Sequence, residues 1–457
     1  MSVTVGFISL GCSKNLVDSQ IMAGYLKAGA IELAPSPEEA DIILINTCAF
    51  IEAAREEAAE SILSACAHKA AGNCRAVIVA GCMVQRYRAR LSKAFPEVDA
   101  FLGIDELERV GEVVRRVADG RTCGVVAKAG DAVKLYNPVY PTLLFTGGPF
   151  AYVKIADGCD HRCAYCAIPL IRGRFRSRPM DDIVRESEAM VSAGVRELNL
   201  VAQDSLMYGA DEGGRPQIAD LMRRVDAIGG DFRFRILYGY PSGVTDDVID
   251  VLNSARHVCK YLDLPIQHSH PSILKAMNRA GAVAATEGLA ERLRQAVPGV
   301  VLRTTCLVGF PGETEAHFEH LLHTLEASRF DHVGVFAFSP EEGTAAVDSD
   351  APNPKVAEAR CRSLMALQKR IVRERARALT GTRDRALLLR REPSGLWHAR
   401  LPRQAPEVDG ETRVKGVPAC AKVGDFLSVT ITGGRGYDLE AVPDNLTMAH
   451  GKKKGQA

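Results

Sequence analysis

The chain has 457 residues, enough for two to four domains, and 47% of them are hydrophobic, so it can bury a sizeable core. Its formal net charge is only +1, which excludes a protein that binds nucleic acid through overall positive charge. Its apolar runs are far shorter than the roughly 20 residues of a membrane span, and no secretory signal is visible at the N-terminus. We therefore expect a cytoplasmic protein with no membrane partner.

The first 130 residues alternate apolar strands with helical stretches. The pattern predicts strands at 4–10, 41–47 and 75–81, and helices at 15–29 and 53–70. Such alternation is typical of a parallel sheet with helices on its faces, and continuous apolar runs indicate strands that are buried on both sides. Residues 1–130 are therefore predicted to form an open parallel α/β sheet domain.

Each of these three strands ends at a cysteine, namely Cys12, Cys48 and Cys82. Ligands bind at the carboxyl ends of the strands in open parallel sheets, so the three thiols are expected to converge on one point. Three thiolates suit an iron–sulfur cluster that leaves one iron without a protein ligand. Zinc is the alternative, although a structural zinc site usually has a fourth ligand.

Residues 131–150 are rich in proline and glycine and are expected to be a linker. A longer α/β series follows, with strands predicted at 151–156, 197–203, 233–239, 261–267, 301–310 and 332–338. Six β/α steps fall short of the eight of a complete barrel, so residues 151–375 predict a partial (β/α)6 TIM-like barrel.

The loop after the first of these strands contains Cys159, Cys163 and Cys166 in a CxxxCxxC pattern. Three cysteines this close together can hold one metal centre, and no fourth cysteine is nearby. The pattern fits a [4Fe–4S] cluster whose fourth iron is free to bind a small chelating molecule.

The pattern of residues changes in the last part of the chain. A helix is predicted over 355–379, a segment that contains eight Lys or Arg residues and two Glu residues. Its basic side chains form either a solvated face or a docking surface for an acidic partner. Short strand-like runs then predict a small antiparallel β-barrel over residues 380–445. Between residues 380 and 442, ten Lys/Arg and eight Asp/Glu leave a net charge of +2, which is weak support for phosphate binding. The tail 446–457 is expected to be disordered.

The CxxxCxxC loop after the first barrel strand resembles the radical S-adenosylmethionine (SAM) superfamily. With three strand-end cysteines ahead of it and a small barrel behind it, the chain resembles the methylthiotransferases of that superfamily from about residue 3 to residue 445. The resemblance implies a cluster domain, a radical SAM barrel and a C-terminal TRAM domain. It also implies SAM as radical source and methyl donor, and two [4Fe–4S] clusters, on Cys12, Cys48 and Cys82 and on Cys159, Cys163 and Cys166.

Two branches of these enzymes differ in substrate: one modifies adenosine in tRNA, the other an aspartate in small-subunit ribosomal protein twelve. The chain resembles the second branch in the stretches "GCSKNLVDS", "RGRFRSRP", "VAQDSLMYG" and "RTTCLVGFPGET". The tRNA branch tends to have a Gly-Cys-Gln-Met-Asn start, and Gln-Asn where this chain has Gln203-Asp204. A terminal barrel of near-neutral charge also suits a protein substrate better than RNA. We therefore expect methylthiolation at the β-carbon of that aspartate, with tRNA as the alternative substrate.

The resemblance also implies cofactor-binding residues. Tyr165 is expected near the adenine of SAM, and Gln203 lies at the end of the second barrel strand, where site residues gather. Arg303 is expected to hold the carboxylate of SAM through a bidentate fork. For each there is an ordinary structural alternative: core packing for Tyr165, a strand-end cap for Gln203 and a surface position for Arg303.

The implied partners are the ribosomal protein, a sulfur donor and a reducing electron donor such as flavodoxin or ferredoxin. Two readings of other classes remain open on the sequence, namely an electron-transfer protein with two clusters and a zinc-bearing RNA-binding module. Cluster count, metal content and cleavage of SAM separate these readings.

Overall fold

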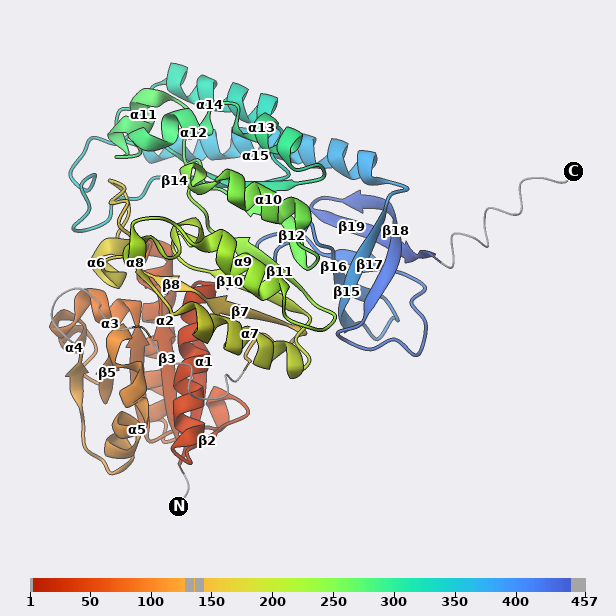
Figure 1. Ribbon diagram of the computed structural model, residues 1–457. Helices are drawn as coiled ribbons and strands as arrows, with labels where there is room; N and C mark the ends of the chain where they lie inside the picture. Colours follow the sequence, from red (N-terminus) through yellow and green to blue (C-terminus); the bar gives the residue numbers. More distant parts are fainter. Residues whose placement is uncertain (1–2, 128–134, 136–143, 445–457) are drawn as a thin grey trace, which may run out of the picture.

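The computed structural model describes residues 3–127, 135 and 144–444, which form three domains (Figure 1). Most of the predicted linker at 131–150 and all of the predicted tail at 446–457 lie outside the described residues. Within these ranges, no helix is both long enough and apolar enough to cross a membrane.

The N-terminal domain is a parallel sheet with the strand order β2-β1-β3-β4-β5-β6, and the three strands predicted here are confirmed as β1, β3 and β4. Its strands are β1 (Thr4–Ser9), β2 (Glu32–Leu33), β3 (Ile42–Thr47), β4 (Ala76–Gly81), β5 (Ala100–Leu102) and β6 (Gly124–Val126). Its helices are α1 (Ser13–Ala28), α2 (Glu52–Ala70), α3 (Cys82–Tyr87), α4 (Ala89–Ala94) and α5 (Val110–Ala118), with the 3₁₀ turns η1 (Pro37–Glu39) and η2 (Ile104–Arg109).

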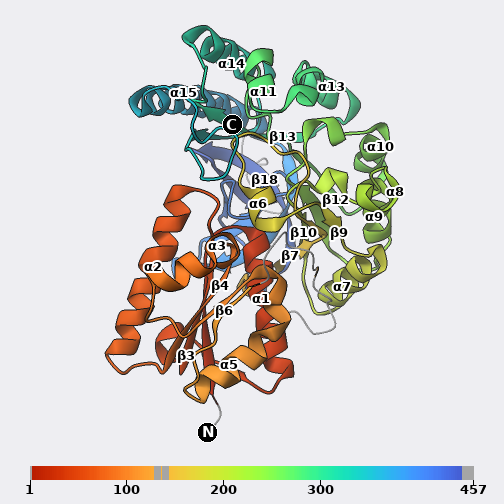
Figure 2. The ribbon, with the colours of Figure 1, turned by 90° about the vertical axis from the view of Figure 1, so that its left-hand side faces the viewer.

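Helices cover both faces of this sheet. Ile43 and Ile45 of β3 pack in a cluster with α2, whereas Ile42 and Leu44 pack with α1 and α5. Figure 2 shows α2 and α5 on opposite sides of the sheet. A strand that is buried on both faces needs apolar side chains at every position, which explains the continuous apolar runs in the sequence.

The central domain is a sheet of six parallel strands in the order β14-β13-β12-β11-β10-β7, as the predicted partial barrel requires. The strands of this domain are β7 (Phe150–Lys154), β8 (Ala156–Asp157), β9 (Arg176–Ser177), β10 (Glu197–Val201), β11 (Arg233–Leu237), β12 (Val258–Asp263), β13 (Val301–Val308) and β14 (His332–Ala337). Strands β8 and β9 form a separate two-stranded sheet.

The helices of the central domain lie mainly outside the sheet and share one large apolar core with it. They are α6 (Ile168–Arg172), α7 (Met180–Ser192), α8 (Ala210–Gly213), α9 (Ile218–Asp226), α10 (Asp246–Ser254), α11 (Pro271–Ala276), α12 (Val283–Thr286), α13 (Leu289–Ala296), α14 (Glu315–Ser328) and α15 (Pro354–Leu379). Three 3₁₀ turns lie between them, at η3 (Ser205–Met207), η4 (Pro241–Gly243) and η5 (Ala280–Ala282).

The basic helix predicted over 355–379 is confirmed as α15. It buries an apolar stripe that includes Leu364 and Ile371. Part of its positive charge is used within the chain, since Arg375 lies 2.7 Å from Asp331.

The C-terminal domain is a closed five-stranded barrel in the order β15-β16-β17-β19-β18. Its strands are β15 (Arg383–Arg391), β16 (Trp397–Arg400), β17 (Thr412–Val414), β18 (Phe426–Arg435) and β19 (Asp438–Pro443). The barrel is antiparallel as predicted except where β17 pairs with β19 in parallel, a pairing that depends on how the barrel closes.

Candidate active site

The three strand-end cysteines meet at one edge of the N-terminal sheet. Strands β1, β3 and β4 are neighbours, and Cys48 and Cys82 directly follow β3 and β4. Cys12 stands just beyond β1, at the N-cap of α1. Because parallel strands end at the same edge, the sheet itself brings the three thiols together.

Two glycines make this close approach possible. Gly11 has a φ of +88°, and a Cβ there would lie 2.6 Å from the Cβ of Cys48. Gly81 has a φ of +96°, and a Cβ there would lie 2.2 Å from Oδ1 of Asn46. Any side chain at either position would force the strand ends apart, so glycine precedes Cys12 and Cys82 for a steric reason.

The environment of these thiols disfavours their charged form. Cys48 and Cys82 are buried, whereas Cys12 is exposed. Burial raises the pKa of Cys48, and it raises the pKa of Cys82 to about 12 although the charge of Arg172 acts in the opposite direction. Metal ligands are thiolates, so a positively charged metal centre would supply the stabilisation that the buried thiolates lack.

Cys159, Cys163 and Cys166 lie in the loop between β8 and α6. The backbone N–H of Cys166 donates to the carbonyl of Cys163 at 3.0 Å, which curls the loop on itself. Burial raises the pKa of Cys159 and of Cys166 to about 12. The charge of Cys163 contributes to the raised pKa of both residues, because the loop holds the thiols close to one another.

The donor chemistry of both cysteine sets suits an iron–sulfur cluster, which takes thiolate ligands. Within the described parts of the chain, no group of three His, Cys, Asp or Glu side chains could hold one metal ion between them. In a [4Fe–4S] cluster each thiolate binds a different iron, so the sulfur atoms stand further apart than around one zinc ion. Three thiols in each set match the number of protein ligands of a cluster that leaves one iron open.

Side chains from later parts of the central domain cover the cysteine loop. Nε2 of His161 lies 2.6 Å from Oδ2 of Asp204, and its ring stacks on Tyr240 with centroids 3.9 Å apart. The guanidinium of Arg279 lies 4.1 Å from the Tyr240 ring centroid and donates to Sγ of Cys163 at 3.5 Å. Tyr240 and Arg279 were not predicted from the sequence, since both lie far along the chain and reach the loop only through folding.

Two of the predicted cofactor-binding residues lie close to the cysteine loop. Tyr165 stands edge-on to Phe310 with ring centroids 6.4 Å apart, and burial raises the pKa of its hydroxyl well above the ordinary range. Nε2 of Gln203 donates to Oδ1 of Asp157 at 2.8 Å. Oε1 of Gln203 is buried and has no hydrogen-bond partner among the described residues, so it is available to a bound molecule.

The third, Arg303, joins the central sheet to the C-terminal barrel. Its Nη1 donates to Oδ1 of Asp263 at 3.0 Å, and its Nε lies 3.7 Å from Oδ1 of Asp409. Asp409 also accepts a hydrogen bond from the hydroxyl of Tyr261 at 2.7 Å. In this arrangement the charge of Arg303 is paired with carboxylates of the same chain.

The inner face of the central sheet is filled by the other two domains. Val17 and Ile21 of α1 and Ala405 of the β16–β17 connection pack with Tyr152 and Tyr261 in one apolar cluster. Helix α1 therefore lies against the inner face of the partial barrel and brings its first residues, among them Cys12, towards the central domain.

A buried charge network links the two cysteine-bearing domains. Arg172 donates from Nη1 to Asp18 at 2.8 Å and to Asp157 at 3.1 Å, and from Nη2 to Sγ of Cys82 at 3.1 Å. Lys154 pairs with Asp18 and lies 3.2 Å from Asp157. All four charged side chains are buried, and the two cations balance the two carboxylates. Although burial acts to raise it, the two cations hold the pKa of Asp157 well below its usual range.

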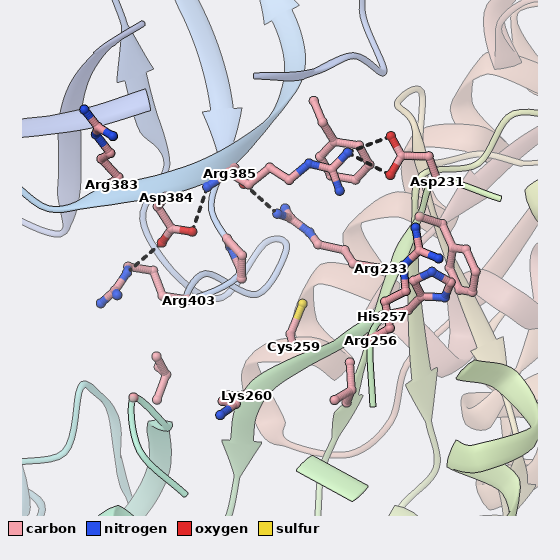
Figure 3. Close-up of a pocket in the computed structure, with 16 residues that line it drawn as sticks. Asp231, Arg233, Arg256, His257, Cys259, Lys260, Arg383, Asp384, Arg385 and Arg403 are labelled. Carbon is pink, nitrogen blue, oxygen red and sulfur yellow. Dashed lines mark hydrogen bonds and ion pairs between the residues drawn. The ribbon is translucent and has the colours of Figure 1, made fainter. Parts of the chain in front are cut away.

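A hollow of about 550 Å³ lies at the opposite end of the central strands, against the C-terminal barrel (Figure 3). Two of its lining residues, Arg233 and Val258, are the first residues of β11 and β12. Part of its charge is already paired, as between Arg385 and Asp231 at 2.6 Å. Because the cysteine loop follows the carboxyl end of the parallel strands, this hollow is separate from the cysteine site.

Three family models match successive parts of the chain. They are "Uncharacterized protein family UPF0004" over residues 4–103, "Radical SAM superfamily" over residues 153–325 and "TRAM domain" over residues 381–443. These matches confirm the three kinds of domain that the sequence predicted.

Solved structures support the fold. The radical S-adenosylmethionine methyltransferase TsrM from Kitasatospora setae, whose structure holds cobalamin and a [4Fe–4S] cluster, covers 76% of this chain and 74% of its own, with a TM-score of 0.57 and 14% identity. The cobalamin-dependent radical enzyme OxsB covers 81% of this chain and 56% of its own, with a TM-score of 0.52 and 12% identity. At such low identity these likenesses show the fold alone.

Sequence relatives are much closer. The "Ribosomal protein uS12 methylthiotransferase RimO" of Pelotomaculum thermopropionicum is 41% identical over 442 residues, which cover 96% of this chain and 99% of the relative. The protein of the same name from Symbiobacterium thermophilum is 43% identical over 96% of this chain and 90% of the relative. With this identity along nearly its whole length, and with a radical SAM domain followed by a TRAM domain, the chain belongs to the RimO family of radical SAM methylthiotransferases.

Proposed function

We propose that this enzyme attaches a methylthio group to the β-carbon of one aspartate in ribosomal protein uS12, the small-subunit protein twelve. The observation that carries the proposal is the identity of 41–43%, over 96% of the chain, to proteins named as uS12 methylthiotransferases. That identity extends through all three domains, so it includes the parts that would bind the cofactors and the parts that would meet the substrate.

The proposed cofactors are SAM and two [4Fe–4S] clusters. When bound, a reduced cluster with SAM supplies the radical that removes hydrogen from the target carbon, and the second cluster offers an open iron for sulfur. The first cluster is assigned to the loop thiols of Cys159, Cys163 and Cys166. The second cluster is assigned to the strand-end thiols of Cys12, Cys48 and Cys82. Two separate sets of three thiols, each without a fourth cysteine, support this assignment.

We assign the protein's own contribution to binding and orientation. Gln203 offers a buried, unpartnered Oε1 to a donor group of SAM. Tyr165 offers a half-buried ring, and it directly precedes Cys166 in the loop. The guanidinium of Arg303 would have to release Asp263 before it could bind the carboxylate of SAM. Arg303 is therefore the least ready of the three residues to bind SAM.

The buried network around Arg172 would hold the two cofactor-binding parts in a fixed relation. It contacts Cys82 on one side and Asp157, next to Gly158 and Cys159, on the other. Buried ion pairs with this many hydrogen bonds are specific in geometry, and a fixed separation is what transfer of sulfur to a short-lived carbon radical requires.

We further propose a cytoplasmic location, an electron donor such as flavodoxin or ferredoxin, and a separate sulfur donor. A ribosomal protein substrate and a cluster that must be reduced in each cycle support these partners. We also propose domain limits near residues 130, 151, 375 and 380; the matched ranges that begin at residues 153 and 381 lie close to two of them.

Mass spectrometry of uS12 tests the proposal. After anaerobic incubation with reconstituted enzyme, reductant, sulfide and SAM, we expect uS12 to gain about 46 Da, the replacement of one hydrogen by a methylthio group. Fragmentation should assign the gain to one aspartate. The same gain on tRNA adenosine, with uS12 unmodified, would overturn the substrate and leave the radical chemistry intact.

A further inference from the structure

No carboxylate among the described residues forms an ion pair with the Lys14 ammonium, although the charges of Cys12 and Asp263 act on it from a greater distance. Its Nζ lies 3.5 Å from the ring centroid of Tyr238, in a cation–π contact. The residue is only partly buried, so its ammonium group remains open to a bound molecule. A partly desolvated ammonium without an anion is an arrangement that a carboxylate would complete.

Lys14 also lies between the two sets of thiols. It stands in the first turn of α1, two residues after Cys12. Its partner Tyr238 follows β11, two residues before Tyr240, and the Tyr240 ring stacks on His161 of the cysteine loop. One short segment after β11 therefore touches Lys14 on one side and the cysteine loop on the other.

The backbone of that segment is held in an uncommon conformation. Tyr238 has a φ of +63°, a left-handed value that bulky residues rarely adopt. Such residues persist where the surrounding structure imposes them, and they gather at functional sites. Here the strained backbone fixes the aromatic ring beneath the Lys14 ammonium.

The other buried cations near the thiols are already engaged. Arg172 is paired with two carboxylates, and Arg279 donates to the carbonyl of Pro265 at 2.8 Å. The carboxylate of Asp263, whose charge acts on Lys14, is held by Arg303 at 3.0 Å. Lys14 thus differs from these cations, because no carboxylate among the described residues is paired with it.

We propose that Lys14 binds the side-chain carboxylate of the target aspartate. This inference rests on the proposed function and names the residue that would recognise its substrate. A charge-assisted contact of about 2.8 Å between Nζ and a carboxylate oxygen would anchor the carboxylate carbon of the aspartate, Cγ. The reacting β-carbon is bonded to that carbon, so the contact would hold it between the loop thiols and the strand-end thiols.

Peptide binding tests the assignment directly. The probes are a fluorescent synthetic peptide that spans the target aspartate of uS12 and the same peptide with asparagine at that position. The variants are Lys14→Met, which removes the charge, and Lys14→Arg, which keeps it. Lys27→Met is the matched control, because Lys27 is exposed in the last turn of the same helix.

On reconstituted enzyme, Lys14→Met should weaken binding of the aspartate peptide by about tenfold or more and change binding of the asparagine peptide by less than about threefold. Lys14→Arg should retain most of the affinity, and Lys27→Met all of it. Lys14→Gln provides a second neutral variant if methionine disturbs the iron content. With whole uS12, the loss of the anchor should raise KM more than it lowers kcat, and should increase the 5′-deoxyadenosine formed per modified protein.

Two results would overturn the assignment: unchanged binding of the aspartate peptide by both neutral variants, or an equal loss for both peptides, which would indicate a structural role. If the unaltered enzyme neither binds the aspartate peptide nor modifies uS12, the proposed function itself is wrong and the role of Lys14 falls with it. If the unaltered enzyme modifies uS12 and the Lys14 variants do so equally well, only the role of Lys14 is wrong.

Discussion

Nη2 of Arg172, at the end of α6, donates a hydrogen bond to Sγ of Cys82, at the start of α3, at 3.1 Å. The two residues belong to different domains and are 90 residues apart in the sequence. Figure 2 shows α6 beside the N-terminal domain, close to α3. The same guanidinium holds Asp157, whose carboxylate accepts a hydrogen bond from Gln203. One buried side chain thus contacts a thiol of the strand-end set and a carboxylate beside the loop set.

Removal of the Arg172 charge should change the redox behaviour of the strand-end cluster. A cationic donor beside a cluster sulfur stabilises the reduced, more negative state. In a Cys159→Ala, Cys163→Ala, Cys166→Ala background, which leaves one cluster, Arg172→Gln should lower the reduction potential by on the order of 60 mV, a tenfold shift of a one-electron equilibrium. Titration followed by electron paramagnetic resonance measures it. Arg172→Lys keeps the charge and should shift the potential less; equal potentials in all three proteins would contradict the role of Arg172.

The enzyme should bind two clusters. After anaerobic reconstitution, we expect about eight iron and eight sulfide per chain, four of each per cluster. Replacement of Cys159, Cys163 and Cys166 by alanine should leave about half of the iron, because the strand-end set is built from a separate domain. Elemental analysis with a sulfide assay gives the result. Zinc in place of iron, or full iron content in the triple variant, would rule out the assignment.

The strand-end thiols should be needed for sulfur insertion and not for cleavage of SAM. Cys12→Ala, Cys48→Ala and Cys82→Ala should each abolish the methylthio product, whereas formation of 5′-deoxyadenosine, which reports the loop cluster, should continue. Chromatography of both products from one reaction measures this division. Cys66→Ala on α2, outside both sets, is the control and should remain active. Normal product from any one of the three variants would show that the thiols do not share an essential cluster.

Glu197 should couple acid stability to the contact between the central sheet and the C-terminal barrel. Its buried carboxylate lies 2.6 Å from Arg233, 2.9 Å from Arg235 and 2.7 Å from Arg400 of β16. Burial alone would raise its pKa, but the three arginines hold the pKa well below the ordinary value of 4.5. A lowered folded-state pKa contributes stability above the unfolded value, and this stability is lost as the pH falls below about 4.5 and towards the folded value.

Glu197→Gln leaves three buried arginines without their carboxylate and should lower the free energy of unfolding by about 3–5 kcal/mol at neutral pH. The difference from the unaltered protein should narrow as the pH falls below about 4.5, since Glu197 then takes up a proton in the unfolded chain while it stays ionised in the folded protein. Urea titrations across this pH range measure both effects. Glu188→Gln, at an exposed position of α7, is the control. A difference that stays constant with pH would indicate lost packing rather than lost charge.

Sequence alone determined the strands at whose ends the two sets of cysteines stand. The apolar runs that end at Cys12, Cys48 and Cys82 became β1, β3 and β4 together with the turns that follow them. The six strands of the central domain also followed from the pattern of apolar residues. These features were predictable because a parallel sheet orders its strand ends at one edge, so strand periodicity and the position of a cysteine suffice to place it.

Only the tertiary structure decided how these parts act on one another. The contact of Arg172 with Cys82, the ring of Tyr238 beneath Lys14 and the reach of Arg279 to Cys163 join segments that no local pattern relates. The parallel pairing of β17 with β19 likewise depends on closure of the barrel. Sequence patterns record which side of an element is buried, whereas partners across domains are set by shape and charge over surfaces that exist only after each domain has folded.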